Sequence, residues 1–337
     1  MASWIPRRPR SWRIFFPFAV VLLLAVAWTV FWYRAAQATE ATVAAWVERE
    51  AAAGRVYSCA SRSVGGYPFR IEVRCTEPVA QWSGLGSPWT IKAQALIGVA
   101  QVYQPNLLIA EITGPLLIAE AGRPLAHAEW KLAQASLRGL PPAPERISVV
   151  IDNARVERAP AGGAAAWMTA DKLEFHVRLA PVSAGSAPVL EFALRAGKAS
   201  SPIVGFLAKP ADADVTAILR GLNDLRPKPL AERLRELQAS GGRLEVTQAR
   251  IERDRAVTVA SGGLGLNTGG RLDGLFTITM AGLENLSLGL GGAELGLTLL
   301  GKPTELEGKR AVVLPLRIRD GAVSLGPLPL GRVPPLY

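Results

Sequence analysis

The chain begins with an uninterrupted apolar run and only later changes to an alternating pattern. Residues 14–33 read IFFPFAVVLLLAVAWTVFWY and contain no charged side chain. A helix rises about 1.5 Å per residue, so a run of this length spans about 30 Å, the thickness of the hydrocarbon core of a bilayer. Aromatic residues lie at both ends of the run, where amphipathic rings favour the headgroup region. The pattern therefore predicts a transmembrane helix.

The helical pattern continues in residues 34–54, which we interpret as a juxtamembrane helix. This stretch is rich in alanine, places Val43, Trp46 and Val47 at helical spacing, and reaches a natural stop at Gly54. The two helical segments are able to form one long helix that leads out of the membrane.

Beyond Gly54 the period of the pattern changes to two. In residues 68–75 (PFRIEVRC) apolar and charged side chains alternate, so Cys75 shares the apolar face of a strand. A glycine pair at 65–66 precedes this strand and suits a hairpin connection. We expect an antiparallel pair in which Cys59 faces Cys75 and the chain reverses at Tyr67.

The remaining chain divides by pattern into three parts. Residues 55–190 contain short two-periodic segments bounded by Gly, Pro or Asn, which predict an antiparallel meander with one buried face. Residues 191–241 form a predicted helical segment with helices at 211–225 and 230–239. Residues 242–337 return to strands and include an Asp-Gly hairpin signal at 320–321. The predicted fold class is mainly β (α+β), a transmembrane helix followed by a curved antiparallel sheet with a few covering helices. The sheet either closes as a barrel or stays an open groove.

The charge distribution orients the helix. The formal charge is 38 − 28 = +10, and the first 34 residues contain five arginines and no acidic residue. Arginines in residues 1–13 predict a cytoplasmic tail and a translocated body. The alternative is a cleaved signal peptide, because the small residues at 36–38 suit cleavage after Ala38. The apolar run exceeds the usual length of a signal core, which favours the uncleaved anchor. Proteins that wrap nucleic acid usually carry basic clusters interleaved with aromatics, whereas here the basic excess flanks the membrane segment, so we expect no nucleic-acid partner.

The two cysteines, Cys59 and Cys75, are interpreted as structural. A translocated body lies in an oxidising compartment, where disulfides persist. We therefore expect a disulfide between them, and the alternative is a pair of free buried thiols.

The sequence nominates no catalytic, metal-binding or cofactor-binding residue. The chain has two histidines, His127 and His176, and neither has a second His or a Cys at ligand spacing. It contains no G-x-S-x-G motif. The glycine-rich residues 261–270 (SGGLGLNTGG) fit neither a dinucleotide fingerprint nor a P-loop. We expect no enzyme. A hydrolase would require one histidine to lie near a serine and a carboxylate in a pocket.

Two stretches resemble a known family. Residues 66–75 (GYPFRIEVRC), after a membrane span and a short helix, and residues 314–336 (LPLRIRDGAVSLGPLPLGRVPPL) resemble the domain of unknown function 2125 family, uncharacterised membrane-anchored bacterial envelope proteins. The resemblance covers nearly the whole chain. Residues 242–282 are similar in style to AsmA-like proteins, which are associated with envelope lipid homeostasis. No catalytic residue is established for the first family, so none is carried over.

These observations lead to one main functional hypothesis. We expect a single-pass protein of the bacterial inner membrane, anchored by residues 14–33, with a cytoplasmic N-terminus and a periplasmic body. Its expected role is non-enzymatic, the binding or shielding of lipid in an apolar groove. The alternative is a structural partner of another envelope protein, docked through an exposed sheet edge or the C-terminal segment PLPLGRVPPLY.

Overall fold

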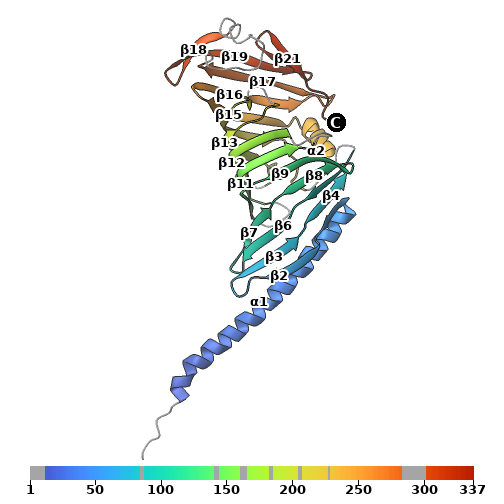
Figure 1. The fold of residues 1–337 in the computed structure, drawn as a ribbon, viewed down its shortest axis with the longest axis vertical. Coiled ribbons are helices and arrows are strands. Elements are labelled where there is room, and N and C mark those ends of the chain that lie inside the picture. The colour runs from blue at the N-terminus through green and yellow to red at the C-terminus, as the bar shows by residue number, and fades with distance from the viewer. Residues whose placement is uncertain are drawn as a thin grey trace, which may run out of the picture.

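A long helix and a curved, open antiparallel sheet make up the molecule (Figure 1). The computed structural model describes residues 12–83, 87–139, 144–159, 165–181, 185–203, 207–226, 228–282 and 301–337. Most of the expected cytoplasmic tail, residues 1–11, lies outside these ranges. The mainly β fold class with an N-terminal apolar helix is confirmed, and of the two expected forms of the sheet the described strands have the open one.

Two helices and 21 strands are described. The helices are α1 (Trp12–Ala52) and α2 (Leu230–Ala239). The strands are β1 (Arg55–Ser58), β2 (Ser61–Gly65), β3 (Arg70–Thr76), β4 (Val79–Ser83), β5 (Pro88–Lys92), β6 (Ala95–Gln101), β7 (Gln104–Thr113), β8 (Leu116–Glu120), β9 (Arg123–Glu129), β10 (Leu132–Arg138), β11 (Arg146–Arg158), β12 (Ala165–Leu179), β13 (Leu190–Ala199), β14 (Ala211–Arg220), β15 (Arg243–Arg253), β16 (Ala256–Leu266), β17 (Leu272–Ala281), β18 (Lys302–Leu306), β19 (Lys309–Arg319), β20 (Ala322–Leu325) and β21 (Leu328–Arg332).

The strands form one antiparallel meander that follows the chain. The pairs β1–β4, β4–β5, β5–β8 and β8–β9 form one half of its first part, and β2–β3, β3–β6, β6–β7 and β7–β10 form the other half. Both halves end on β11, which pairs with β9 and with β10. Strands β11 to β17 then pair in order, β17 pairs with β19, and β19 pairs with β18 and β20. Strand β21 completes the sheet beside β20.

Short breaks interrupt each of the first five long strands and so divide this part of the sheet into the two halves. The two pieces of these long strands are β1 and β2, β3 and β4, β5 and β6, β7 and β8, and β9 and β10. Two breaks contain a proline, Pro78 between β3 and β4 and Pro115 between β7 and β8, which cannot donate a ladder hydrogen bond. At the break between β9 and β10, the Trp130 indole donates a hydrogen bond of 2.8 Å to the Ile112 carbonyl. The side chain of Trp130 therefore fills the position where the ladder stops.

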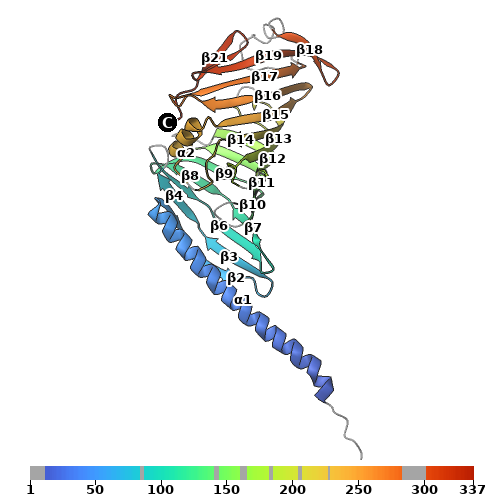
Figure 2. The same cartoon turned by 180° about the vertical axis from the view of Figure 1, so that it is seen from behind.

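The helix α1 has two different halves (Figure 2). Its C-terminal half lies along β1 and β2, where the rings of Trp46 and Tyr57 stack with centroids 4.8 Å apart. Its N-terminal half projects away from the sheet with exposed apolar side chains. The described residues contain one helix long and apolar enough to cross a membrane, and it is this one. The helix runs through 33 and 34 without interruption, as one long helix.

The helix expected at 211–225 is wrong, because residues 211–220 form strand β14, and the start of the expected helical segment forms β13. The stretch ADADVTAILR is rich in helix-forming alanine, but Ala213, Val215 and Ala217 alternate with polar residues and pair on both sides with β13 and β15. Sheet pairing overrides the local propensity here. The helix expected at 230–239 is confirmed as α2, which ends before Gly241, at φ +66°.

The disulfide between Cys59 and Cys75 is confirmed, with Cα atoms 5.5 Å apart, although the expected register of the hairpin is wrong. Arg62, not Cys59, lies opposite Cys75 in the ladder. The physical reason is the break between β1 and β2. It contains Cys59, which leaves the ladder and reaches across to Cys75.

Candidate functional site: an apolar face across the sheet

One row of apolar side chains crosses thirteen strands on a single face of the sheet. Residues directly opposite each other in a ladder project to the same face. The register from β2 to β19 gives the row Val64, Val73, Gly98, Ala110, Ala135, Val149, Phe175, Leu194, Val215, Ala249, Ala260, Ile278 and Leu314. Twelve strand spacings of about 4.8 Å make this row about 58 Å long along the sheet. We call it the apolar track.

A second apolar row runs beside the track on the same face. It extends from β3 to β19 and consists of Ile71, Ala100, Leu108, Leu137, Ile147, Val177, Phe192, Ala217, Val246, Gly262, Phe276 and Leu316. The two rows contact each other at Phe175 and Phe192, whose ring centroids lie 6.2 Å apart. Together we call them the apolar face.

The apolar face is open in its middle and closed at its C-terminal end. Phe175 and Leu194 are 39% and 40% exposed, whereas Leu314 is 1% exposed. Leu314 belongs to a buried cluster with Met280, Val312 and Leu325, and this cluster closes only the far end of the track.

The contacts of the two helices agree with this description. Of the described helices, α1 packs mainly on β1 and β2, and α2 packs on β16. The middle of the apolar face is therefore not covered by either described helix. Such a surface is typical of a ligand or partner site.

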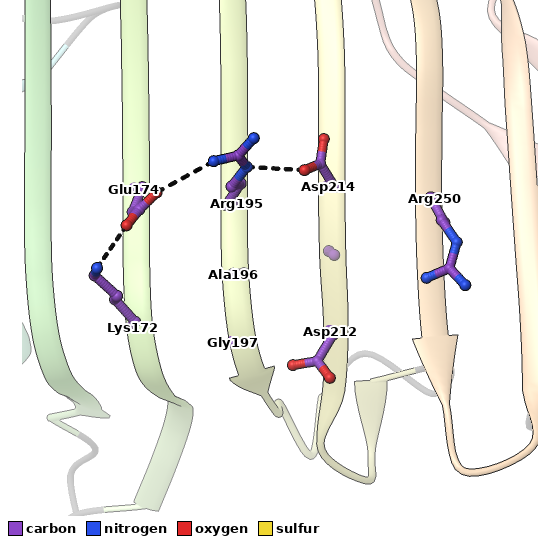
Figure 3. Close-up of a pocket in the computed structure, with 9 residues that line it drawn as sticks. Lys172, Glu174, Arg195, Ala196, Gly197, Asp212, Asp214 and Arg250 are labelled. Carbon is purple, nitrogen blue, oxygen red and sulfur yellow. Dashed lines mark hydrogen bonds and ion pairs between the residues drawn. The ribbon is translucent and has the colours of Figure 1, made fainter.

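The opposite face carries a ladder of paired charges (Figure 3). The Lys172 ammonium lies 2.7 Å from Glu174 Oε1, and the Arg195 guanidinium lies 2.9 Å from Asp214 Oδ2. The hydrogen bond from Lys172 lowers the pKa of Glu174 below its usual value. Arg250 pairs with carboxylates of Glu252 and Glu307. Because these charges neutralise one another, we interpret the ladder as a solvated structural face.

The two histidines lie in strands. His127 is in β9, with Nε2 3.6 Å from Glu129 Oε1. His176 is in β12, with Nε2 3.8 Å from Glu174 Oε2, and Ser148 lies opposite it in β11. A serine, a histidine and a carboxylate thus share one patch. Strand β11 is paired on both sides at Ser148, so its backbone N–H groups there serve the ladders and form no oxyanion hole.

Other chemistry has little support in the part of the chain that the structure describes. No group of three His, Cys, Asp or Glu side chains there is arranged to hold a metal ion. Of the glycine-rich residues 261–270, the first six belong to β16 and the others form a turn in which the Asn267 side chain accepts hydrogen bonds from two backbone N–H groups. The expectation that the chain is not an enzyme stays a prediction.

Sequence reasoning predicted a buried apolar face but did not identify the track. Alternation was visible in each strand, and it was the only signal available. The alignment of rows between strands depends on turn lengths and on register shifts, such as those between Thr216 and Ala217 and between Val246 and Ala249. These shifts keep the apolar residues on one face where simple counting would move them to the other.

Comparison with known proteins gives one result. No curated protein and no solved structure matches the chain. The resemblance to AsmA-like proteins is not shown and stays a prediction. Residues 32–334 match the family described as uncharacterised protein conserved in bacteria (DUF2125). The match begins at Trp32, within the half of α1 that contacts the body, and includes the whole sheet. The chain therefore belongs to the DUF2125 family of uncharacterised bacterial proteins.

Proposed function

We propose that this protein is a non-enzymatic, membrane-anchored component of the bacterial cell envelope that binds lipid acyl chains along the apolar face. The observation that carries the proposal is the apolar track, which crosses thirteen strands and is half-exposed in its middle. Burial of apolar surface contributes roughly 25 cal/mol per Å². An occupant with a flexible hydrocarbon surface would gain this free energy along the open part of the row, where Phe175 and Leu194 are exposed.

The length of the track suits acyl chains. One leaflet of the hydrocarbon core of a bilayer is about 15 Å thick, so a track of about 58 Å is as long as several acyl chains laid end to end. The track offers no charged side chain to them.

The proposed location is the inner membrane, with the body in the periplasm. The apolar half of α1, the arginines before it and the disulfide support this topology. Retention of the anchor is supported by Trp32 and Ala36, which are 5% and 9% exposed and hence part of the folded body. Cleavage after Ala38 would remove both. The intact mass of the protein extracted from membranes tests this point, and a mature chain beginning at Thr39 would contradict the anchor.

A photo-crosslinking experiment tests lipid binding. The full-length protein carries p-benzoylphenylalanine at position 194, on the apolar face, or at position 195, the next residue of β13 on the charged face. Both positions lie on the same strand and both are exposed, so they form a matched pair. After irradiation in cells, mass spectrometry of the purified protein should find lipid adducts at position 194, at several times the yield at position 195.

Two outcomes would count against the proposal. Equal adduct yields at the two positions would show contact with bulk lipid or detergent rather than binding on one face. A complete lack of lipid adducts at 194, with native mass spectrometry also free of co-purified lipid, would contradict it directly.

A second candidate function has one observation in its favour. Strand β21 pairs in the described sheet with β20 alone, which leaves an edge for strand addition by a partner protein. The C-terminal residues after β21 already contact other parts of this chain. The Leu336 amide donates to the Gly270 carbonyl at 2.9 Å, and the Arg235 guanidinium lies 5.2 Å from the Tyr337 ring centroid. Crosslinking at β21 that recovers a stoichiometric protein, without lipid at position 194, would favour this alternative.

A further inference from the structure

The loop between β2 and β3 is fastened to α1 inside the apolar segment of the helix. The Trp28 indole donates to the Pro68 carbonyl at 2.9 Å, and the Trp32 indole donates to the Arg70 carbonyl at 2.8 Å. The Thr29 and Tyr67 hydroxyl groups lie 2.8 Å apart. These contacts fix the height of the loop along the helix.

The same end of the sheet presents large exposed aromatic rings. Tyr67, Phe69 and Tyr103 are 53%, 63% and 68% exposed. Tyr103 lies in the turn between β6 and β7, and this turn adjoins the first loop because the Val102 amide donates to the Phe69 carbonyl at 3.0 Å. On the helix beside them, Tyr33 is 60% exposed. Exposed aromatic rings therefore cluster at one end of the body, next to the helix.

The position of this cluster along α1 places it at a membrane surface. Its contacts fall on residues 28–32, and the five steps from Trp28 to Tyr33 correspond to about 7.5 Å along a helix. The headgroup region on each side of a bilayer is about 5–7 Å thick. If residues 14–33 span the membrane, the loops beside residues 28–32 reach the boundary between headgroups and acyl chains, where Tyr and Trp rings are favoured.

We propose that Tyr67, Phe69 and Tyr103 form a membrane-contact lip, which inserts into the headgroup boundary of the same bilayer that α1 crosses. The inference rests on the anchor of the proposed function and names the source of the lipid, the outer leaflet of that bilayer. The lip is at the ends of β2, β3, β6 and β7, the strands in which the apolar face begins. An acyl chain thus passes from the leaflet to the apolar face without crossing water.

The charges beside the lip suit a surface that contains anionic lipids. Arg70 and Arg74, whose side chains are both 58% exposed, pair with the same buried carboxylate of Glu72. Two guanidinium groups and one carboxylate leave a net positive charge in β3, the strand that follows Phe69, and such a charge attracts anionic headgroups.

Fluorescence quenching in vesicles tests the lip. The full-length protein, with its native disulfide intact, receives a single additional cysteine as Phe69→Cys, Tyr103→Cys or Ala121→Cys, and each is labelled with a bimane. Ala121 lies at the other end of the long β7–β8 strand and is exposed, so it is the control. The variants are reconstituted in phosphatidylethanolamine–phosphatidylglycerol vesicles that contain lipids brominated near the headgroup.

We expect at least twofold stronger quenching by brominated lipid at positions 69 and 103 than at 121, and the reverse order with aqueous iodide. The inference would be overturned if the labels at 69 and 103 behaved like the label at 121. Tyr103 is the more exposed of the two residues, so Tyr103→Cys keeps the test valid if Phe69→Cys fails to fold, as judged by circular dichroism.

The outcome is separable from that of lipid binding. Quenched lip labels, with neither lipid adducts at position 194 nor co-purified lipid in native mass spectrometry, would support the lip and contradict the proposed function. Lipid adducts at 194 with unquenched lip labels would contradict the lip and leave lipid binding in place.

Discussion

The two faces of this sheet are built from the same strands and differ in how far their side chains are paired with one another. The apolar track and the row one residue away from it run side by side from β3 to β19. This neighbouring row projects to the opposite, charged face and consists of Arg74, Ile97, Glu111, Gln134, Val150, Glu174, Arg195, Asp214, Arg250, Val259, Thr279 and Val313. Its charges in β12–β14 satisfy one another across the strands. In the middle of the track, Phe175 and Leu194 stay 39% and 40% exposed in the described structure.

The difference shows which face the two described helices leave uncovered. Antiparallel sheets commonly pack one face on a core and leave the other solvated. Here the strands have the matching alternation, but the middle of the apolar face lies outside the contacts of both described helices. An external hydrocarbon occupant would supply the layer that a second sheet supplies in a sandwich.

The largest expected effect is on the free energy of unfolding, and it distinguishes the closed end of the track from its open middle. Leu314→Ala, at a position 1% exposed, should lower the free energy of unfolding by about 2–5 kcal/mol, because it leaves a cavity in a packed cluster. Leu194→Ala, at a position 40% exposed, should cost less than half as much. Urea unfolding of both variants in the same detergent measures the difference. Equal losses would show that Leu194 is covered in solution and would break the comparison.

A smaller effect is expected where the track begins. The bond between Cys59 and Cys75 closes a loop with a sequence separation of 16, and a loop of this size contributes about 3 kcal/mol by restricting the unfolded chain. The variant with both cysteines replaced by serine should unfold at a lower urea concentration. Wild-type protein treated with a reductant is the control, since it should match the variant. An unchanged midpoint in both would mean that the bond does not stabilise this end.

Particular residues show which parts of the fold could be predicted from the sequence. The apolar run, the helix at 230–239 and the alternation around Val73 each follow from local patterns, and all three hold in the structure. The alanine-rich pattern of residues 211–225 predicts a helix, because alanine is a good helix former. The conformation of residues 211–220 is instead decided by two neighbouring strands that a local window does not contain. The hairpin register failed for a similar reason, because the break at Cys59 depends on the neighbouring strands of the sheet.

Less of the candidate site than of the fold could be predicted from the sequence. The disulfide could be predicted from two cysteines and a translocated topology. The apolar face needed the register of every pair from β2 to β19, and its openness needed the knowledge that both helices lie elsewhere. The aromatic lip joins Trp28 to Pro68, forty residues apart in sequence, through a hydrogen bond that no periodicity reveals.

The smallest expected effect concerns acid, which should act on the charged face and spare the apolar one. The pKa of Glu174 is lowered in the folded protein, first by the hydrogen bond from Lys172. A carboxyl with a depressed folded pKa stabilises the fold above its unfolded pKa, and this contribution is lost as the pH falls through the folded value.

Between pH 5 and pH 3, wild type should therefore lose slightly more stability than Glu174→Gln. Leu194→Ala should follow the wild-type pH dependence, because it removes no titrating group. The shift should be smaller than the loss caused by Leu314→Ala, since partly exposed ion pairs are screened by water. Parallel urea midpoints for wild type and Glu174→Gln across this range would show that the ionisation of Glu174 does not contribute to stability, and would contradict the expected difference between the two faces in acid.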